Sequence, residues 1–169
     1  MKEKKSLIIY FSRADENYFG GEIKYIDKGN TEIIAEFIQE FTGADMFKVE
    51  PKVPYSADYM ECTREAQERT SSHNAEIIES IPDVSPYEVI YIGSPVYWGG
   101  MPEEMFTALK GTDFTGKTIR VFVTHEGSGL SSIPAQVKSI YQGATILDDA
   151  IAIRGTDCKN SKNRIEQWI

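Results

Sequence analysis

Two adjacent aromatic residues, Tyr97 and Trp98, and two glycines come shortly after the apolar run 89–93. Aromatic rings stack on flat ligands, and glycines let the backbone come close to such a ligand. The apolar run is typical of a strand buried on both faces of a parallel sheet. Pro102 and two glutamates then predict the start of a helix. This stretch therefore predicts a surface for a planar ligand at the carboxyl end of a central strand.

A second group of residues has the side chains of an anion site. Ser12 follows the apolar run 6–11, and Asn30 and Thr31 precede apolar residues at helical spacing. Hydroxyls, an amide and the free N–H groups of a helix N-terminus bind phosphate without a lysine. In a chain of net charge −8, phosphate binding must depend on such local donors. The alternative interpretation is that Ser12 and Asn30 only cap the helix and turn the chain.

A third loop, His125 to Gly129, follows the apolar run 118–124. Thr124 and Ser128 add hydroxyl groups, and the small residues leave backbone N–H groups accessible. His125 is a candidate to protonate or orient a substrate, because imidazole titrates near neutral pH. The alternative for this third loop is a plain glycine turn. The alternative for the second loop is that Tyr97 and Trp98 only fill the core.

The alternation of strands and helices predicts a single domain, residues 1–169, with a parallel sheet and helices on both of its faces. In such a sheet the three loops leave the same edge, where open α/β sheets bind ligands. The expected strands are 6–11, 44–50, 89–93, 118–124 and 145–153. The expected helices are 30–43, with Asn30 as its cap, 58–70, 102–110, 131–141 and 160–169.

Composition excludes several classes of protein. The charge of −8 argues against nucleic-acid and anionic-membrane surfaces, and no apolar run approaches the ~20 residues of a membrane span. Cys62 and Cys158 lie far apart, which predicts reduced thiols in a cytoplasmic protein. His73 and His125 lack the spacing of metal ligands, so no metal is expected. Neither a P-loop nor a Rossmann glycine pattern is present.

The chain resembles the flavodoxin-like FMN-binding family. The matching segments are Ile8–Arg13, Gly29–Thr31, Phe41–Pro51, Gly93–Gly99 and Thr124–Gly129. The resemblance implies FMN as cofactor and a three-layer α/β sandwich whose five parallel strands run in the order 2-1-3-4-5. It implies that Ser12, Arg13, Asn30 and Thr31 hold the phosphate. It implies ring and ribityl contacts from Pro95, Val96, Tyr97, Trp98 and Gly99. Across the ring it implies Thr124, His125, Glu126, Gly127, Ser128 and Gly129.

Two features depart from the family pattern. The segment Ala14–Lys28 interrupts the phosphate loop, and Gly20-Gly21 within it predicts a hairpin turn. We interpret this segment as a flap that narrows access to the phosphate or docks a partner; the alternative is a surface excursion with no role. His125 and Gly100 also stand where relatives often carry a tyrosine and an acid. Both changes disfavour a carrier of very low redox potential.

These observations predict an FMN-binding redox protein that transfers electrons to a partner protein with a basic docking surface. The first alternative is an FMN-dependent NAD(P)H:quinone-type oxidoreductase that acts on a small-molecule acceptor. A distant alternative is a non-flavin signalling domain of the same topology. The sequence leaves the oligomeric state open.

Overall fold

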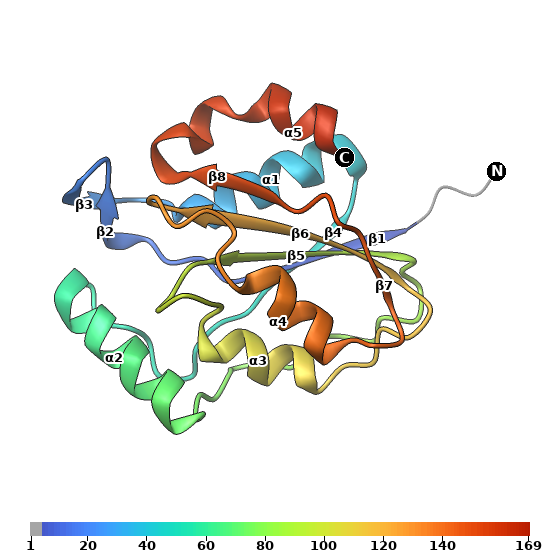
Figure 1. Cartoon of the computed structure of the whole chain (residues 1–169), viewed down its shortest axis with the longest axis horizontal. Coiled ribbons are helices and arrows are strands. Elements are labelled where there is room, and N and C mark those ends of the chain that lie inside the picture. Colours follow the sequence, from blue (N-terminus) through green and yellow to red (C-terminus); the bar gives the residue numbers. More distant parts are fainter. Residues whose placement is uncertain (1–4) are drawn as a thin grey trace.

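The parallel sheet is described from a computed structural model that covers residues 5–169 (Figure 1). Its strands are β1 (Ser6–Tyr10), β4 (Asp45–Lys48), β5 (Val89–Pro95), β6 (Thr118–His125), β7 (Thr145–Ile146) and β8 (Ile151–Arg154). The order is β4-β1-β5-β6, and both β7 and β8 pair with β6. Every pairing in this sheet is parallel. The predicted fold class is therefore confirmed, and the predicted order holds with the fifth strand divided.

The expected fifth strand, 145–153, is two short strands separated by residues 147–150, which include the charged Asp148 and Asp149. β7 pairs with the beginning of β6 and β8 with its end. Between them, Asp148 forms an ion pair with Lys138 and Asp149 forms one with Arg120.

Helices cover both faces of the sheet. They are α1 (Asn30–Thr42), α2 (Tyr59–Ser72), α3 (Glu103–Lys110), α4 (Ile133–Ile140) and α5 (Lys162–Trp168), with a 3₁₀ helix, η1, at Gly155–Asn160. Figure 1 shows α1 and α5 on one face and α3 and α4 on the other. Alternation along β1 divides the core accordingly: Leu7 and Ile9 pack with the cluster around α3 and α4, and Ile8 and Tyr10 with the cluster around α1. None of these described helices is long and apolar enough to cross a bilayer.

The ends of α1 differ in how well the sequence predicted them. Gly43 ends the helix as expected, with φ of 68° and its N–H donating to the Gln39 carbonyl at 2.8 Å. The expected N-cap, Asn30, is wrong: Gly29 is the cap and Asn30 is the first helical residue. The capping role passes to Ser12, whose hydroxyl accepts the N–H of Glu32 at 3.1 Å.

The segment that interrupts the phosphate loop forms a hairpin of its own. Strands β2 (Asp15–Phe19) and β3 (Glu22–Ile26) pair antiparallel outside the main sheet. Gly20 and Gly21 form the expected turn, with φ of 64° and 87°. The hairpin lies at the carboxyl edge of the sheet, next to the N-terminal end of α2 (Figure 1).

Candidate functional site

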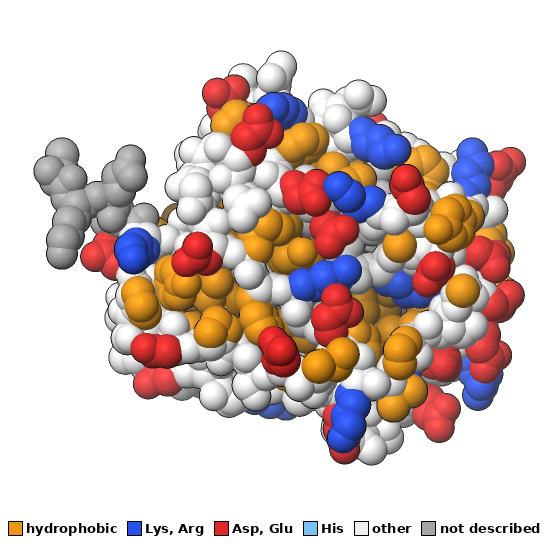
Figure 2. Space-filling view, turned by 180° about the vertical axis from the view of Figure 1, so that it is seen from behind, with side chains coloured by type: hydrophobic (Ala, Val, Ile, Leu, Met, Phe, Trp, Pro, Cys, Tyr) orange, Lys and Arg blue, Asp and Glu red, His pale blue; other side chains and the backbone are white. Residues whose placement is uncertain are grey.

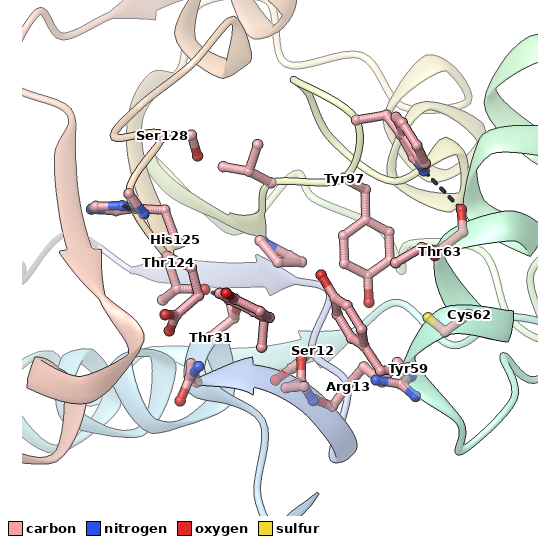
Figure 3. Close-up of a pocket in the computed structure, with 18 of the residues that line it drawn as sticks. Ser12, Arg13, Thr31, Tyr59, Cys62, Thr63, Tyr97, Thr124, His125 and Ser128 are labelled. Carbon is pink, nitrogen blue, oxygen red and sulfur yellow. Dashed lines mark hydrogen bonds between the residues drawn. The ribbon is translucent and has the colours of Figure 1, made fainter. Parts of the chain in front are cut away.

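The loops after β1, β5 and β6 converge on a pocket of about 630 Å³ at the carboxyl edge of the sheet (Figure 3). The structure thus brings together every sequence-predicted site residue except Gly99 and Gly129. The pocket is lined by Ser12, Arg13, Asn17, Tyr18, Asn30, Thr31, Tyr59, Met60, Cys62, Thr63, Pro95, Val96, Tyr97, Trp98, Thr124, His125, Glu126, Gly127 and Ser128.

The first loop and the start of α1 form the polar end of the pocket. The hydroxyls of Thr31 and Thr124 lie 2.7 Å apart and are buried, so they join the first loop to the third. Gly29 lets the chain pass close to Ser12, because a Cβ at position 29 would collide with the Ser12 hydroxyl. Ser12 already accepts the N–H of Glu32, while the N–H groups of Asn30 and Thr31 have no partner within the helix and are available to an anion.

Arg13 does not direct its charge into this polar end. Its guanidinium donates to the backbone carbonyls of Glu16, Ser56 and Ala57, the last two at 2.6 and 3.0 Å. The N–H of Glu16 also donates to the Ala57 carbonyl, at 3.2 Å. Arg13 therefore ties the hairpin to the segment that precedes α2. This geometry does not support the predicted phosphate contact of the Arg13 side chain.

The two aromatic residues of the second loop have different surroundings. The Tyr97 ring packs edge-on against Phe11 and Tyr55, with centroids 5.5 and 5.8 Å away, so it fills the core as well as lining the pocket. Trp98 is 57% exposed, and its indole N–H donates to the Thr63 carbonyl at 2.8 Å. Its φ of 51° is in the left-handed region, which a non-glycine residue adopts at a cost of about 1–2 kcal/mol. The indole is thus held in place although it buries little of its own surface.

Gly99 and Gly129 do not line the pocket, contrary to the prediction. The Gly99 carbonyl accepts the hydroxyl of Ser131 at 2.6 Å and the N–H of Ser132 at 3.2 Å. These bonds turn it toward the start of α4. Gly99 and Gly129 have φ of 81° and 64°, so both are needed as turn residues.

His125 and Glu126 in the third loop are both partly buried. The Nδ1 atom of His125 accepts the N–H of Gly127 at 2.9 Å. Burial, and then the charges of Arg154 and Arg164, lower the pKa of His125, so the ring is neutral at pH 7 with its proton on Nε2. Burial raises the pKa of Glu126.

The Glu126 carboxyl group connects the third loop to the hairpin. One of its oxygens, Oε2, accepts the N–H of Gly20 at 3.1 Å. The other, Oε1, is buried and has no partner among the described residues. The hairpin is thus held at its tip by the third loop and at its base by Arg13.

Sequence reasoning missed the wall that the hairpin and α2 build. Its residues in the pocket are Asn17, Tyr18, Tyr59, Met60, Cys62 and Thr63. The rings of Tyr18 and Tyr59 pack together with centroids 6.0 Å apart. The sequence contained one signal for this wall. Helix α2 follows the edge strand β4, so the first turn of α2 lies at the ligand-binding edge of the sheet. The apolar stripe of α2 is also too weak to bury Tyr59 and Met60 in the core.

The side chains present fit a flat ligand that carries a phosphate group. Hydroxyls and a helix N-terminus lie at one end of the pocket, and aromatic rings lie at the other. Residues 5–169 contain no group of three His, Cys, Asp or Glu side chains placed to hold a metal ion. Fold and pocket together define a doubly wound α/β protein with a pocket at the switch point of its sheet, where open α/β sheets bind ligands.

The chain belongs to the flavodoxin family, whose model matches residues 23–169. Among solved structures, it is similar to a candidate flavoprotein from Bacteroides uniformis at 23% identity, covering 99% of this chain and 98% of that one, with a TM-score of 0.76. It is also similar to a candidate flavoprotein from Bacteroides eggerthii at 21% identity, covering 97% of this chain and 94% of that one, with a TM-score of 0.75. A third similar structure is a Lactobacillus acidophilus flavoprotein solved in complex with FMN. It has 23% identity, covers 98% of each chain and has a TM-score of 0.65.

No curated protein matches the chain. At these identities the solved structures show a shared fold alone. The family match confirms the resemblance drawn from the sequence motifs.

Proposed function

We propose that the pocket binds FMN and that the protein is an electron-transfer flavoprotein. The observation that carries this proposal is the convergence of three loops on one pocket, with anion donors at one end and aromatic rings at the other. The flavodoxin family match and the FMN complex of the Lactobacillus acidophilus protein support the same cofactor. When bound, FMN would supply the redox chemistry, since it accepts and gives up electrons.

The residues of this chain would bind the cofactor and exclude water from it. Ser12, Asn30 and Thr31, with the N-terminus of α1, would hold the phosphate by charge-assisted hydrogen bonds, each contributing about 1.5–3 kcal/mol. Trp98 would offer its exposed ring for stacking. His125 would not donate to the cofactor, because its Nδ1 already accepts the Gly127 N–H and Figure 3 shows its imidazole directed away from Tyr97.

The charge around the pocket supports a basic partner protein. Strands β2 and β3 and helix α2 together carry six acidic and three basic residues. Figure 2 shows acidic side chains gathered at its right-hand edge, where these elements lie. Opposite charges speed the encounter of redox partners and orient them. We also propose a cytoplasmic location, because Cys62 and Cys158 are both free and buried.

A small-molecule reductase is the second candidate, and the pocket rim favours it. Tyr18, Met60 and Trp98 are 43%, 63% and 57% exposed, so apolar surface remains at the mouth of the pocket. Such a surface suits a planar acceptor such as a quinone.

Purified apoprotein titrated with FMN tests the binding proposal. We expect quenched flavin fluorescence and much weaker binding of riboflavin, which lacks the phosphate. Equal affinity for the two flavins would contradict our assignment of the polar end. Reduced protein is then mixed with a basic electron-transfer protein or with a quinone. Fast, salt-sensitive oxidation of the reduced flavoprotein by the basic protein supports the electron-carrier function. Nicotinamide-dependent turnover of the quinone supports the reductase function.

A further inference from the structure

Of the six arginines in the chain, two have side chains with no hydrogen-bond or ion-pair partner among the residues that the structure describes. The other four guanidinium groups are occupied by backbone carbonyls or by carboxylates: Arg13, Arg64, Arg69 and Arg120. Within residues 5–169, the side chains of Arg154 and Arg164 form no hydrogen bond and no ion pair, and both residues are exposed. In a chain of net charge −8, two unpaired arginines near one loop call for an explanation.

Arg154 lies directly against the third loop. It is the last residue of β8 and pairs in register with His125. Its Nη2 atom is 3.3 Å from the position that a Cβ at Gly127 would occupy. Arg164, from the first turn of α5, acts electrostatically on the same His125, and both arginines lower the pKa of this residue. Figure 3 shows the imidazole directed away from Tyr97, on the outer side of the loop.

We propose that Arg154, Arg164 and the Nε2–H of His125 form an anion subsite that binds the phosphates of a nucleotide separate from the pocket ligand. A guanidinium stays charged and matches phosphate oxygens with two parallel hydrogen bonds. Two carboxylates lie near this subsite, since Asp157 acts on His125 and Glu126 acts on Arg154. Neither forms an ion pair with Arg154 or Arg164 within residues 5–169, so both guanidinium groups keep their donors for a phosphate.

The phosphate of FMN is the less suitable occupant because other atoms fill the space between Arg154 and the first loop. A Cβ at Gly155 would lie 2.6 Å from both the Asn30 Nδ2 and the Glu126 Oε1 atoms. The Gly155 backbone and the Glu126 side chain therefore separate the arginines from Asn30. The substrate class rests on the proposed function: beside a flavin pocket, a diphosphate-bearing redox nucleotide is the ligand that this subsite would serve.

Calorimetric titration with ADP, which carries a diphosphate, tests the subsite in both the FMN-loaded protein and the apoprotein. We expect ADP to bind and adenosine not to bind. The double variant R154Q/R164Q should bind ADP at least tenfold more weakly. About 1 M salt should weaken binding to the unchanged protein, because the Debye length falls to about 3 Å. The control K52Q/K138Q makes the same change in net charge at lysines that pair with Glu76 and Asp148, and it should leave ADP binding unchanged.

Three results would overturn the proposal. The first is an unchanged protein that does not bind ADP, or that binds adenosine equally well. The second is an equal loss of ADP binding in the control variant. The third is an R154Q/R164Q variant that loses FMN affinity but keeps riboflavin affinity, because the arginines would then hold the phosphate of FMN. Binding of ADP to an apoprotein that fails to bind FMN would support the subsite while refuting the proposed cofactor, so the two failures are distinguishable.

Discussion

The buried hydroxyl pair of Thr31 and Thr124 gives a sharp test of how the site is assembled. The two oxygens are 2.7 Å apart, and the residues are 2% and 4% exposed. Thr124→Val replaces a hydroxyl by a methyl group of similar size and leaves the Thr31 hydroxyl with no partner and little access to water. An unsatisfied buried polar group costs about 1–3 kcal/mol. Thr31→Val should cost a similar amount for the same reason.

The double variant T31V/T124V should be more stable than the two single changes predict. Replacing both partners by apolar groups of the same shape leaves no unsatisfied hydroxyl and can be nearly neutral. If each single variant loses about 2 kcal/mol and the double variant loses about 1, the coupling energy is about 3 kcal/mol. A coupling of this size would identify the contact as the join between the first and third loops.

Urea unfolding of the apoprotein, followed by circular dichroism, measures these free energies. Thr118→Val is the matched control, because this threonine lies at the other end of β6 and its hydroxyl forms no hydrogen bond within residues 5–169; we expect a change below about 0.5 kcal/mol. Additive losses in the double variant would refute the reasoning. Unchanged stability in both single variants would refute it as well.

Three further changes test other parts of the structure. Glu104→Gln breaks a buried ion pair with Arg69 (2.7 Å) and should lower the free energy of unfolding, measured in urea, by about 3–5 kcal/mol. A loss below about 1 kcal/mol would show that this ion pair does not stabilise the fold. Burial raises the pKa of Glu126, so the folded state keeps a proton that the unfolded state releases, and stability falls as pH rises from 4.5 toward the higher folded pKa. Glu126→Gln should abolish that fall, and an unchanged pH profile would contradict it. Arg13→Gln should speed protease cleavage within residues 14–28, by at least tenfold, without lowering the global unfolding midpoint; equal cleavage rates would show that Arg13 does not hold the hairpin.

The parts of the fold that the sequence predicted are those that local pattern determines. Continuous apolar runs gave the buried strands β1, β5 and β6, because a strand covered on both faces has no polar side to show. The helix end at Gly43 and the turn at Gly20-Gly21 were predictable because glycine favours the positive φ angles that these positions adopt. The division of the fifth strand was not predictable in this way, because the pattern of residues 145–153 does not show where their pairing with β6 breaks.

The position of each site loop was predictable from the strand that it follows, but the direction of individual side chains and carbonyl groups was not. Topology alone places the three loops at one edge, so most of the predicted residues line one pocket. The direction of the Arg13 guanidinium depends on the carbonyls of residues 56 and 57, which only the folded chain brings near. The Gly99 carbonyl is turned toward α4 by Ser131 and Ser132 for the same kind of reason.

The hairpin is better explained as part of the site than as a surface excursion. A two-stranded hairpin is marginally stable alone, so its contacts with the rest of the protein decide whether it keeps one position. Three of its contacts come from residues that also line the pocket: Arg13 at its base, the packing of Tyr18 against Tyr59 on its side, and Glu126 at its tip. A ligand in the pocket would touch all three attachments, so we expect its binding to stabilise the position of the hairpin.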